Sequence, residues 1–270
     1  MIKIIFSDID GTFLKDDKSF TDLHAKAIKS VVARGLKFVF VSARMPEAIY
    51  PITDAIGMAH TPVISYGGGL ALTENEEVIF DKKISADDAK NILAEMKRSW
   101  QDITINYYTG RRWFVEAIDK RVQFEMDITQ ATAEVATFDG LLSKNIFPNK
   151  ILVMCEPATC EEMERVLGEK FPTLNVVRSA KFLLEIMDKT VSKATGIEVM
   201  LKHYGVALDE AIAFGDNYND VEMLELIPQS VVMANAPDAV KKIASAVTDS
   251  NEESGIYTYL VKAGVINCHG

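Results

Sequence analysis

The chain has 270 residues, of which 48% are hydrophobic and 25% are charged, and it carries a formal net charge of −10. This composition is ordinary for a globular protein, and the length favours two domains over one. The acidic balance disfavours non-specific attraction to nucleic acid or to an anionic membrane, so we expect neither as a partner.

Three cysteines, Cys155, Cys160 and Cys268, show neither metal-ligand spacing nor the even-numbered framework of a secreted disulfide protein. The longest stretch without charge, 55–73, contains a proline and three consecutive glycines, which predicts a loop and a strand in place of a membrane span. The N-terminus lacks the pattern of a signal peptide. We therefore expect a cytoplasmic protein.

The chain begins with an apolar run, 3–7, that predicts a short buried strand and ends at two carboxylates, Asp8 and Asp10. Side chains alternate along a strand, so both carboxylates project to one side if the extended backbone continues through Ile9. A polar turn is the simple interpretation. A calcium loop is excluded, because the residues that it requires after Asp8 are absent. The remaining interpretation is a pair in which one carboxylate attacks or binds metal while the other handles a proton.

A helix is predicted over 21–35 and a strand over 36–41. Strand, helix and strand in this order imply a parallel pair with a right-handed crossover. The second strand ends at Ser42 and Ala43, and ligands of open parallel sheets lie beyond the carboxyl ends of the strands. We therefore expect the Ser42 hydroxyl and the Ala43 amide beside Asp8, where they suit a phosphate. The alternative is that Ser42 only caps the next helix.

A third strand is predicted over 62–66, and the three glycines that follow predict a turn, since they lack the spacing of a phosphate-binding loop. From about residue 81 the pattern changes. Helices are predicted over 87–100, between 117 and 151, and over 158–170, and strands over 103–108, 113–117, 151–155, 174–177 and 182–187. Helices on one antiparallel sheet form an α+β unit. We therefore expect an α/β protein in which residues 1–80 and 188–270 form a Rossmann-like parallel sheet core and 81–187 an inserted α+β domain.

A helix is predicted over 191–204, with Lys193 in its first turn. The helix dipole disfavours a cation there, so an anionic partner would explain this lysine, although most lysines are solvated surface residues. The strand over 210–214 is followed by Asp216, and a helix starting near residue 218 turns Asn219 and Asp220 back toward it. Asp216 is thus a third carboxylate at a strand's end, and such hard oxygen ligands suit Mg²⁺. The alternation continues with a strand over 230–233, a helix over 240–244 and a helix after 255.

Four motifs in this order resemble those of the haloacid dehalogenase superfamily. They are Asp8-Ile9-Asp10-Gly11-Thr12, Ser42-Ala43-Arg44, Lys193 before a helix, and Gly215-Asp216-Asn217-Tyr218-Asn219-Asp220. The inserted domain, together with the segments 233–237 and 251–255, is similar to the Cof-type sugar phosphatase branch. The resemblance covers nearly the whole chain, and four motifs in order are far more specific than any one of them.

The resemblance implies that Asp8 is the nucleophile that takes the phosphoryl group as an aspartyl phosphate, and that Asp10 is the acid and then the base. It also implies that Mg²⁺ is held by the carboxylates of Asp8 and Asp216 and the backbone carbonyl of Asp10, with Asp220 supporting the metal indirectly. The phosphate oxygens would meet Ser42, Lys193, Asn219 and the amides of Ile9 and Ala43. A carboxylate at Asp10 favours phosphate esters over dehalogenation, because expelling an alkoxide requires an acid.

Three positions depart from the family's pattern. Ser42-Ala43 replaces the commoner Thr-Gly, which keeps the hydroxyl and stiffens the turn. Gly67 stands where the branch usually has Asn, so any contact of that side chain is missing. Ala194 replaces a common Gly and suits a helix start equally well.

The sequence therefore predicts a Mg²⁺-dependent phosphatase for a small phosphorylated metabolite, foremost a sugar phosphate, with the inserted domain as a cap that closes over the site. Nucleotide, pyridoxal and flavin phosphates are alternative substrates. A phosphomutase or phosphotransferase would use the same intermediate, and a metabolite-binding regulator would keep a degenerate site. An aromatic and basic hairpin either contacts substrate or only packs with a solvated edge. Its residues are Tyr107, Tyr108, Arg111, Arg112 and Trp113.

Overall fold

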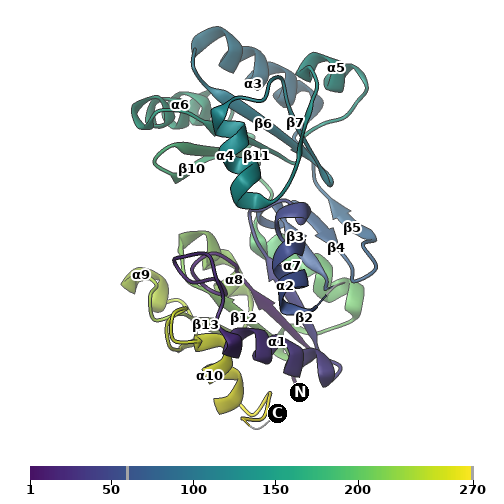
Figure 1. The fold of residues 1–270 in the computed structure, drawn as a ribbon, viewed down its shortest axis with the longest axis vertical. Helices are drawn as coiled ribbons and strands as arrows, with labels where there is room; N and C mark the ends of the chain where they lie inside the picture. The colour runs from purple at the N-terminus through teal and green to yellow at the C-terminus, as the bar shows by residue number, and fades with distance from the viewer. Residues whose placement is uncertain (59–60, 269–270) are drawn as a thin grey trace. The chain divides into compact units, whose positions relative to one another are not determined.

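The computed structural model describes residues 1–58 and 61–268 of the chain. The chain divides into two compact units (Figure 1). The core unit comprises Met1–Arg44, Ile52–Phe80 and Ser192–Gly270, and the cap unit comprises Met45–Pro51 and Asp81–Val191. The short segment Met45–Pro51 thus belongs with the inserted residues, although nothing in its sequence pattern indicates this.

The core unit is built on one eight-stranded sheet. Its strands, in spatial order, are β14 (Ala246–Val247), β13 (Gln229–Val232), β12 (Ala211–Gly215), β1 (Ile4–Ser7), β2 (Lys37–Val41), β3 (Val63–Ser65), β4 (Leu70–Leu72) and β5 (Val78–Asp81). The strands from β14 to β3 are parallel, whereas β4 pairs antiparallel with β3. The carboxyl ends of β12, β1 and β2 therefore lie next to one another at one edge.

Helices pack on both faces of this sheet (Figure 1). The helices outside the insertion are α1 (Asp22–Ala33), α2 (Tyr50–Ile56), α7 (Lys193–Tyr204), α8 (Val221–Leu226), α9 (Asp238–Lys241) and α10 (Gly255–Lys262). On one face, Ile4 packs in a buried cluster with Ile197 of α7. On the other face, the rings of Phe214 and Tyr259 of α10 lie 5.6 Å apart. Because both faces are covered, the strands are continuous apolar runs.

The cap unit contains a six-stranded sheet. Its strands, in spatial order, are β10 (Leu174–Ala180), β11 (Leu183–Asp188), β9 (Lys150–Met154), β6 (Thr104–Thr109), β7 (Arg112–Val115) and β8 (Ala133–Val135). Its helices are α3 (Ala86–Ser99), α4 (Lys120–Thr129), α5 (Phe138–Ser143) and α6 (Pro157–Lys170). Buried side chains of α3, α5 and α6 form one apolar cluster with the sheet, in which Phe138 stacks on Tyr107 at 5.4 Å. The insertion therefore has a hydrophobic core of its own.

The α/β core with an α+β insertion agrees with the prediction, and the elements that the sequence did not indicate are all short. These are β4, β5, β8, α5 and β14. Strands of two to four residues carry too little alternation to be recognised. The expectation of a wholly antiparallel cap sheet is wrong at one pair, because β8 runs parallel to β7. The connection between these two strands contains α4, as a parallel pair requires a crossover.

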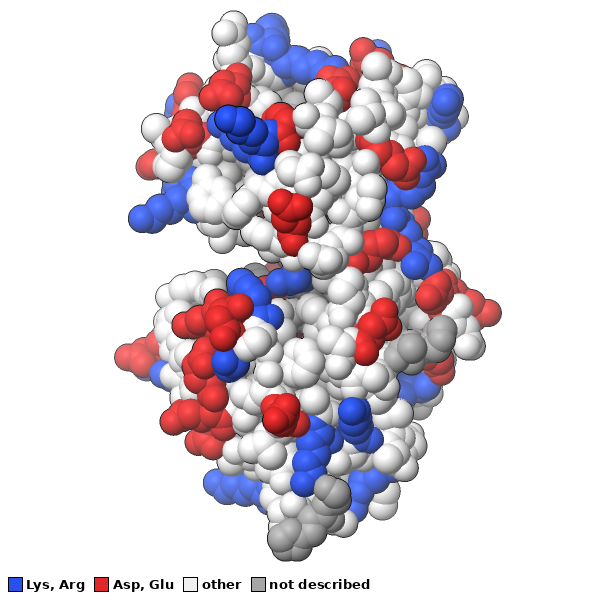
Figure 2. All heavy atoms as spheres, in the orientation of Figure 1, with Lys and Arg blue, Asp and Glu red and all other residues white. Residues whose placement is uncertain are grey.

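The uncharged stretch 55–73 forms the end of α2, then β3, a glycine turn and the whole of β4, while residues 59 and 60 lie outside the described residues. Among the helices of the described chain, none is both long and apolar enough to cross a bilayer. Figure 2 shows acidic and basic side chains interspersed over the face that it draws, without a broad basic area.

His24 on α1 is fully buried and gives the core unit a testable response to acid. Its Nδ1–H donates to the carbonyl of Phe13 at 2.9 Å, and Nε2 has no hydrogen-bond partner among the described residues. Burial lowers the pKa of His24 from 6.5 to about 4. As the pH falls, the unfolded chain therefore binds a proton at His24 before the folded chain does. The contribution of His24 to the unfolding free energy is complete above pH 6.5 and is lost as the pH drops toward 4.

We expect His24→Gln to remove this part of the pH dependence of unfolding. Between pH 7.5 and 4.5 the wild type should lose about 2.5 kcal/mol more unfolding free energy than the variant, as the linkage relation gives for this pKa shift. Urea titrations at both pH values measure the difference. His203→Gln, at an exposed histidine, is the control and should follow the wild type. Equal pH dependence of His24→Gln and wild type would contradict the expectation.

Candidate active site

The predicted site residues follow the carboxyl ends of three adjacent parallel strands. Asp8 follows β1, Ser42 follows β2 and Asp216 follows β12. The amide of Asp8 donates to the carbonyl of Phe214 at 3.0 Å, which extends the pairing of β1 and β12 by one residue. The structure therefore gathers these side chains at one edge of the core sheet, where open α/β sheets bind ligands.

Three buried carboxylates meet at this edge. One oxygen each of Asp8, Asp216 and Asp220 lies within 4.8 Å of the others. Burial, opposed by Lys193 and reinforced by the other two carboxylates, raises the pKa of Asp8 to about 8. Burial also raises the pKa of Asp216 to about 6, although Thr12 donates a hydrogen bond to it. Buried carboxylates this close need protons or a cation, and their hard oxygens fit Mg²⁺.

Lys193 provides one cation inside the cluster. Its Nζ donates to Asp8 Oδ1 and, at 2.5 Å, to Asp220 Oδ1, and its side chain is 2% exposed. Burial opposes the charge on this lysine, but Asp220 and Asp8 raise its pKa above the usual range. The second oxygen of Asp220 accepts from the amides of Asp216 (2.8 Å) and Asn217 (3.0 Å). Asp220 is therefore fixed from both sides and holds Lys193 in place.

Lys193 begins α7 because Ser192 caps that helix by accepting from Thr195 N. The glycine turn after β3 packs against this helix start, and a Cβ at Gly68 would collide with the carbonyl of Ser192. Gly68 also has a φ of +113°, which side chains rarely adopt. The predicted turn is thus a close-packed support of Lys193. Gly67, which stands where the Cof-type branch usually has Asn, lies in the same turn. Its amide donates to the Ser42 carbonyl at 2.9 Å, so the backbone at this position stabilises the Ser42 loop without a side chain.

The segment after Asp10 is shaped around Asp216. Thr12 Oγ1 donates to Asp216 Oδ1 at 2.6 Å. Gly11 has a φ of +88°, and a Cβ there would collide with the Asp216 carboxylate. Thr12 is fully buried, and only a glycine at position 11 leaves room for this approach. The sequence prediction did not include Thr12, because nothing local links it to a residue 204 positions away.

Asp10 has different partners from Asp8. Arg44 donates to both of its oxygens at 2.8 Å, and Lys18 Nζ donates to Oδ1 at 3.0 Å. Burial acts to raise the pKa of Asp10, but Arg44 and Lys18 outweigh it and hold the pKa at about 2. Asp10 is a carboxylate in this arrangement. Sequence reasoning gave neither cation a role: Arg44 follows directly on the Ser42 turn, whereas Lys18 carries no local signal.

The remaining predicted residues lie close to the same edge. Ser42 is buried, and its Oγ accepts from the Arg44 amide at 3.2 Å. The next helical turn begins after Met45, so Ser42 does not cap it. Ile9 lies fully buried between Asp8 and Asp10. Asn219 is exposed in the 3₁₀ turn Tyr218–Asp220, next to the buried Asp220.

The aromatic hairpin of the cap unit supports the packing interpretation. Tyr107, Tyr108 and Trp113 are buried, and Trp113 Nε1 donates to Asn106 Oδ1 at 3.1 Å. Its two arginines form ion pairs inside the cap unit: Arg111 with Glu47 at 2.6 Å and Arg112 with Glu134 at 2.6 Å.

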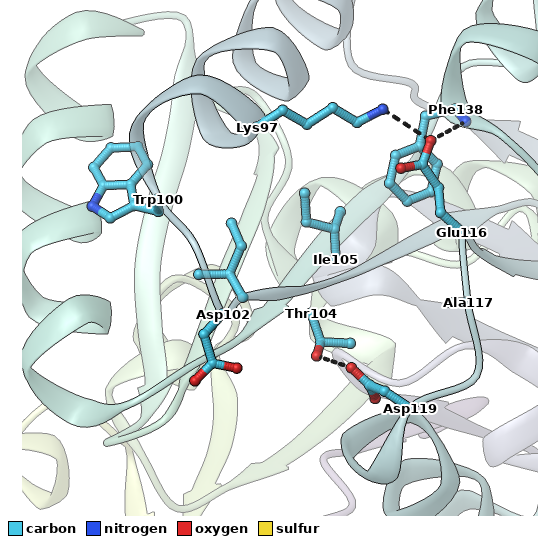
Figure 3. A pocket seen from close by; sticks show the side chains of 10 residues that line it. Lys97, Trp100, Asp102, Thr104, Ile105, Glu116, Ala117, Asp119 and Phe138 are labelled. Carbon is cyan, nitrogen blue, oxygen red and sulfur yellow. Dashed lines mark hydrogen bonds and ion pairs between the residues drawn. The ribbon is translucent and has the colours of Figure 1, made fainter.

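The cap unit also contains a cavity of about 320 Å³ beside β6 (Figure 3). Its charged side chains have partners: Lys97 and the Phe138 amide both donate to Glu116, at 2.9 and 3.0 Å, and Arg121 pairs with Asp102. Thr104 likewise donates to Asp119. Among the described residues that line it, the cavity thus has no group of buried carboxylates crowded together, unlike the core unit.

Comparisons with known proteins agree with this geometry. The model of the haloacid dehalogenase-like hydrolase family matches residues 5–260. A Haemophilus influenzae protein, provisionally named a phosphatase, is 33% identical over 260 residues that cover 95% of this chain and 96% of its own.

Two solved structures are also similar. The structure of TM0651 from Thermotoga maritima superposes with a TM-score of 0.88 at 25% identity and covers 97% of both chains. A sugar phosphatase of HAD subclass IIB, BT4131, shares the fold with a TM-score of 0.81 at 24% identity over 98% of this chain and 100% of its own. The chain therefore belongs to the haloacid dehalogenase-like hydrolases and is a phosphatase enzyme.

Proposed function

We propose that the protein is a Mg²⁺-dependent phosphatase of small phosphorylated metabolites, foremost sugar phosphates, that works through an aspartyl phosphate. The observation that carries the proposal is the buried cluster of Asp8, Asp216 and Asp220 within 4.8 Å, with Lys193 inserted into it. The sugar phosphatase of the same fold supports the substrate class. We also propose that the inserted residues 81–187 act as the domain that selects the leaving group.

The carboxylates of Asp8 and Asp216 and the backbone carbonyl of Asp10 would hold the Mg²⁺. The donor set fits, since these are hard oxygens and their crowding requires a positive charge. When bound, the ion neutralises charge on the phosphate oxygens. Asp220 supports the metal ligands indirectly, because its oxygens are engaged by Lys193 and by the amides of Asp216 and Asn217.

The residues divide the reaction between two carboxylates. Asp8 attacks phosphorus and forms a bond to it while the bond to the ester oxygen breaks, and Asp10 donates a proton to that oxygen. Asp10, now a carboxylate, takes a proton from the water that attacks the aspartyl phosphate, which releases inorganic phosphate and restores Asp8. Lys193 favours the ionised, nucleophilic form of Asp8, since an ammonium in contact opposes the rise in pKa that burial causes.

The phosphate would be held by donors around Asp8. They are the Ser42 hydroxyl, the amides of Ile9 and Ala43, the Lys193 ammonium and the Asn219 amide. Preorganised donors of this kind stabilise charge on the equatorial oxygens, which is the main requirement of phosphoryl transfer.

Phosphate release from a panel of phosphomonoesters, with Mg²⁺ and with excess chelator, tests the proposal. We expect turnover with Mg²⁺, highest among sugar phosphates, and a loss of at least about 100-fold on chelation, because the cluster then lacks its neutralising charge. Equal turnover with chelator would contradict the metal's role. Conversion of a sugar phosphate into its isomer without phosphate release would identify a phosphomutase instead.

A further inference from the structure

Lys18 contacts a site carboxylate from a turn with an unusual backbone. The turn is closed by hydrogen bonds from Lys15 N to Ser19 O (2.8 Å) and from Lys18 N to Lys15 O (3.0 Å), and Asp17 accepts from the Ser19 amide at 2.9 Å. Lys18 itself has a φ of +67°. Residues other than glycine seldom adopt this conformation, and where they do, the site is often functional.

A second turn, near the C-terminus, anchors the segment that carries Lys18. The buried Asn251 donates from Nδ2 to the carbonyl of Leu14 at 3.0 Å. Glu252 Oε1 accepts from the amide of Asp16 at 2.9 Å. The backbone of the turn is therefore held by contacts that do not involve the Lys18 side chain. Changing that side chain should leave the turn in place.

The contacts of Asp10 conflict with its proposed role as an acid. Both of its oxygens accept from cations, Oδ2 from Arg44 and Oδ1 from Arg44 and Lys18. A proton on Asp10 removes the negative charge that attracts both cations, and a proton on Oδ1 has room only where one of the two donors to that oxygen withdraws. Arg44 contacts both oxygens of Asp10 and its side chain is 19% exposed, whereas Lys18 contacts one oxygen and is 58% exposed. Withdrawing Lys18 from Asp10 therefore costs less free energy than withdrawing Arg44.

A bound phosphate ester offers Lys18 a new partner. An acid acts within about 3 Å of the atom that it protonates. Lys18 Nζ lies 3.0 Å from Asp10 Oδ1, so a leaving oxygen that is protonated by Oδ1 lies within about 6 Å of this ammonium, and the phosphorus is one bond beyond that oxygen. An ammonium forms a strong charge-assisted hydrogen bond with phosphate. We infer that Lys18 binds the phosphate group of the substrate, exchanging its contact with Asp10 for one with a phosphate oxygen. The inference rests on the role proposed for Asp10.

Three variants test this exchange: Lys18→Gln, Lys18→Arg and the matched control Lys15→Gln. Lys15 lies in the same turn but pairs with Asp17 at 3.1 Å. Calorimetry with inorganic phosphate and Mg²⁺ measures binding without turnover. We expect Lys18→Gln to raise the dissociation constant about tenfold, as expected for a lost charge-assisted contact, and Lys18→Arg and Lys15→Gln to stay within about twofold.

The weaker binding of phosphate by Lys18→Gln should also appear in its steady-state kinetics. For p-nitrophenyl phosphate and a hexose 6-phosphate alike, KM of Lys18→Gln should rise about tenfold while kcat changes less than about threefold, since the lost contact is with the phosphate common to both. Unchanged phosphate affinity with a reduced kcat would overturn the inference and make Lys18 only a support of Asp10. A wild type that neither binds phosphate nor hydrolyses esters would refute the proposed function, and the inference with it.

Discussion

Replacing Asp8 with asparagine should abolish phosphate release, by at least about 1,000-fold, as for the removal of other enzymatic nucleophiles. The amide has the shape of the carboxylate but not its nucleophilicity. It can still accept from Lys193, which donates to Asp8 in the wild type. The variant also removes one buried acid from a crowded cluster, so its unfolding free energy should not fall. Phosphate release and urea denaturation measure the two effects separately.

The exposed Asp16 provides the matched control for this variant. Asp16→Asn makes the same chemical change eight residues further along and should keep wild-type turnover. An Asp8→Asn protein that is folded and active would show that another group attacks phosphorus. Loss of activity together with loss of the fold would instead assign Asp8 a structural role.

Replacing Lys193 with methionine should reduce both turnover and stability. The two carboxylates that it contacts, Asp8 and Asp220, would stay buried with no ammonium between them. Removing one partner from a buried ionic cluster costs about 3 kcal/mol of unfolding free energy. Turnover should fall at least about 100-fold, as when a preorganised donor is lost from an active site. Urea titration in chelator and phosphate release with Mg²⁺ check the two parts.

Lys202→Met removes a lysine from the exposed side of the same helix and serves as the control for Lys193→Met. Combining Lys193→Met with Asp8→Asn provides a further check. Because Asp8→Asn removes one of the uncompensated carboxylates, the double variant should lose less stability than Lys193→Met alone. Equal stability of Lys193→Met and Lys202→Met would contradict the assigned ionic contacts.

The strand ends of the core unit could be predicted because their signals are local. The apolar run before Asp8 and the run before Ser42 are continuous, as strands covered on both faces require, and each ends where polar residues begin. Since the strands are parallel, predicting them also places their carboxyl ends together. Asp8 and Asp216 lie in one cluster for this reason, although they are far apart in the sequence.

The partners of Asp10 and Asp216 could not be predicted in the same way. Thr12 reaches Asp216 because Gly11 adopts a positive φ, and Lys18 reaches Asp10 because its own φ is positive. Such turn conformations depend on contacts with distant segments, here the turn that contains Asn251. The direction of β8 could not be predicted either, since a strand of three residues carries no indication of whether it pairs parallel or antiparallel.

Trapping the covalent intermediate shows directly whether Asp8 attacks phosphorus. The enzyme is incubated with a sugar phosphate and Mg²⁺, quenched with borohydride, which reduces an aspartyl phosphate to homoserine, and digested for mass spectrometry. The nucleophilic role of Asp8 predicts homoserine at position 8 in the wild type and no modification of the corresponding peptide in the Asp8→Asn protein. An active wild type whose peptide keeps an unmodified Asp8 throughout turnover, or whose modification lies on another residue, would contradict it.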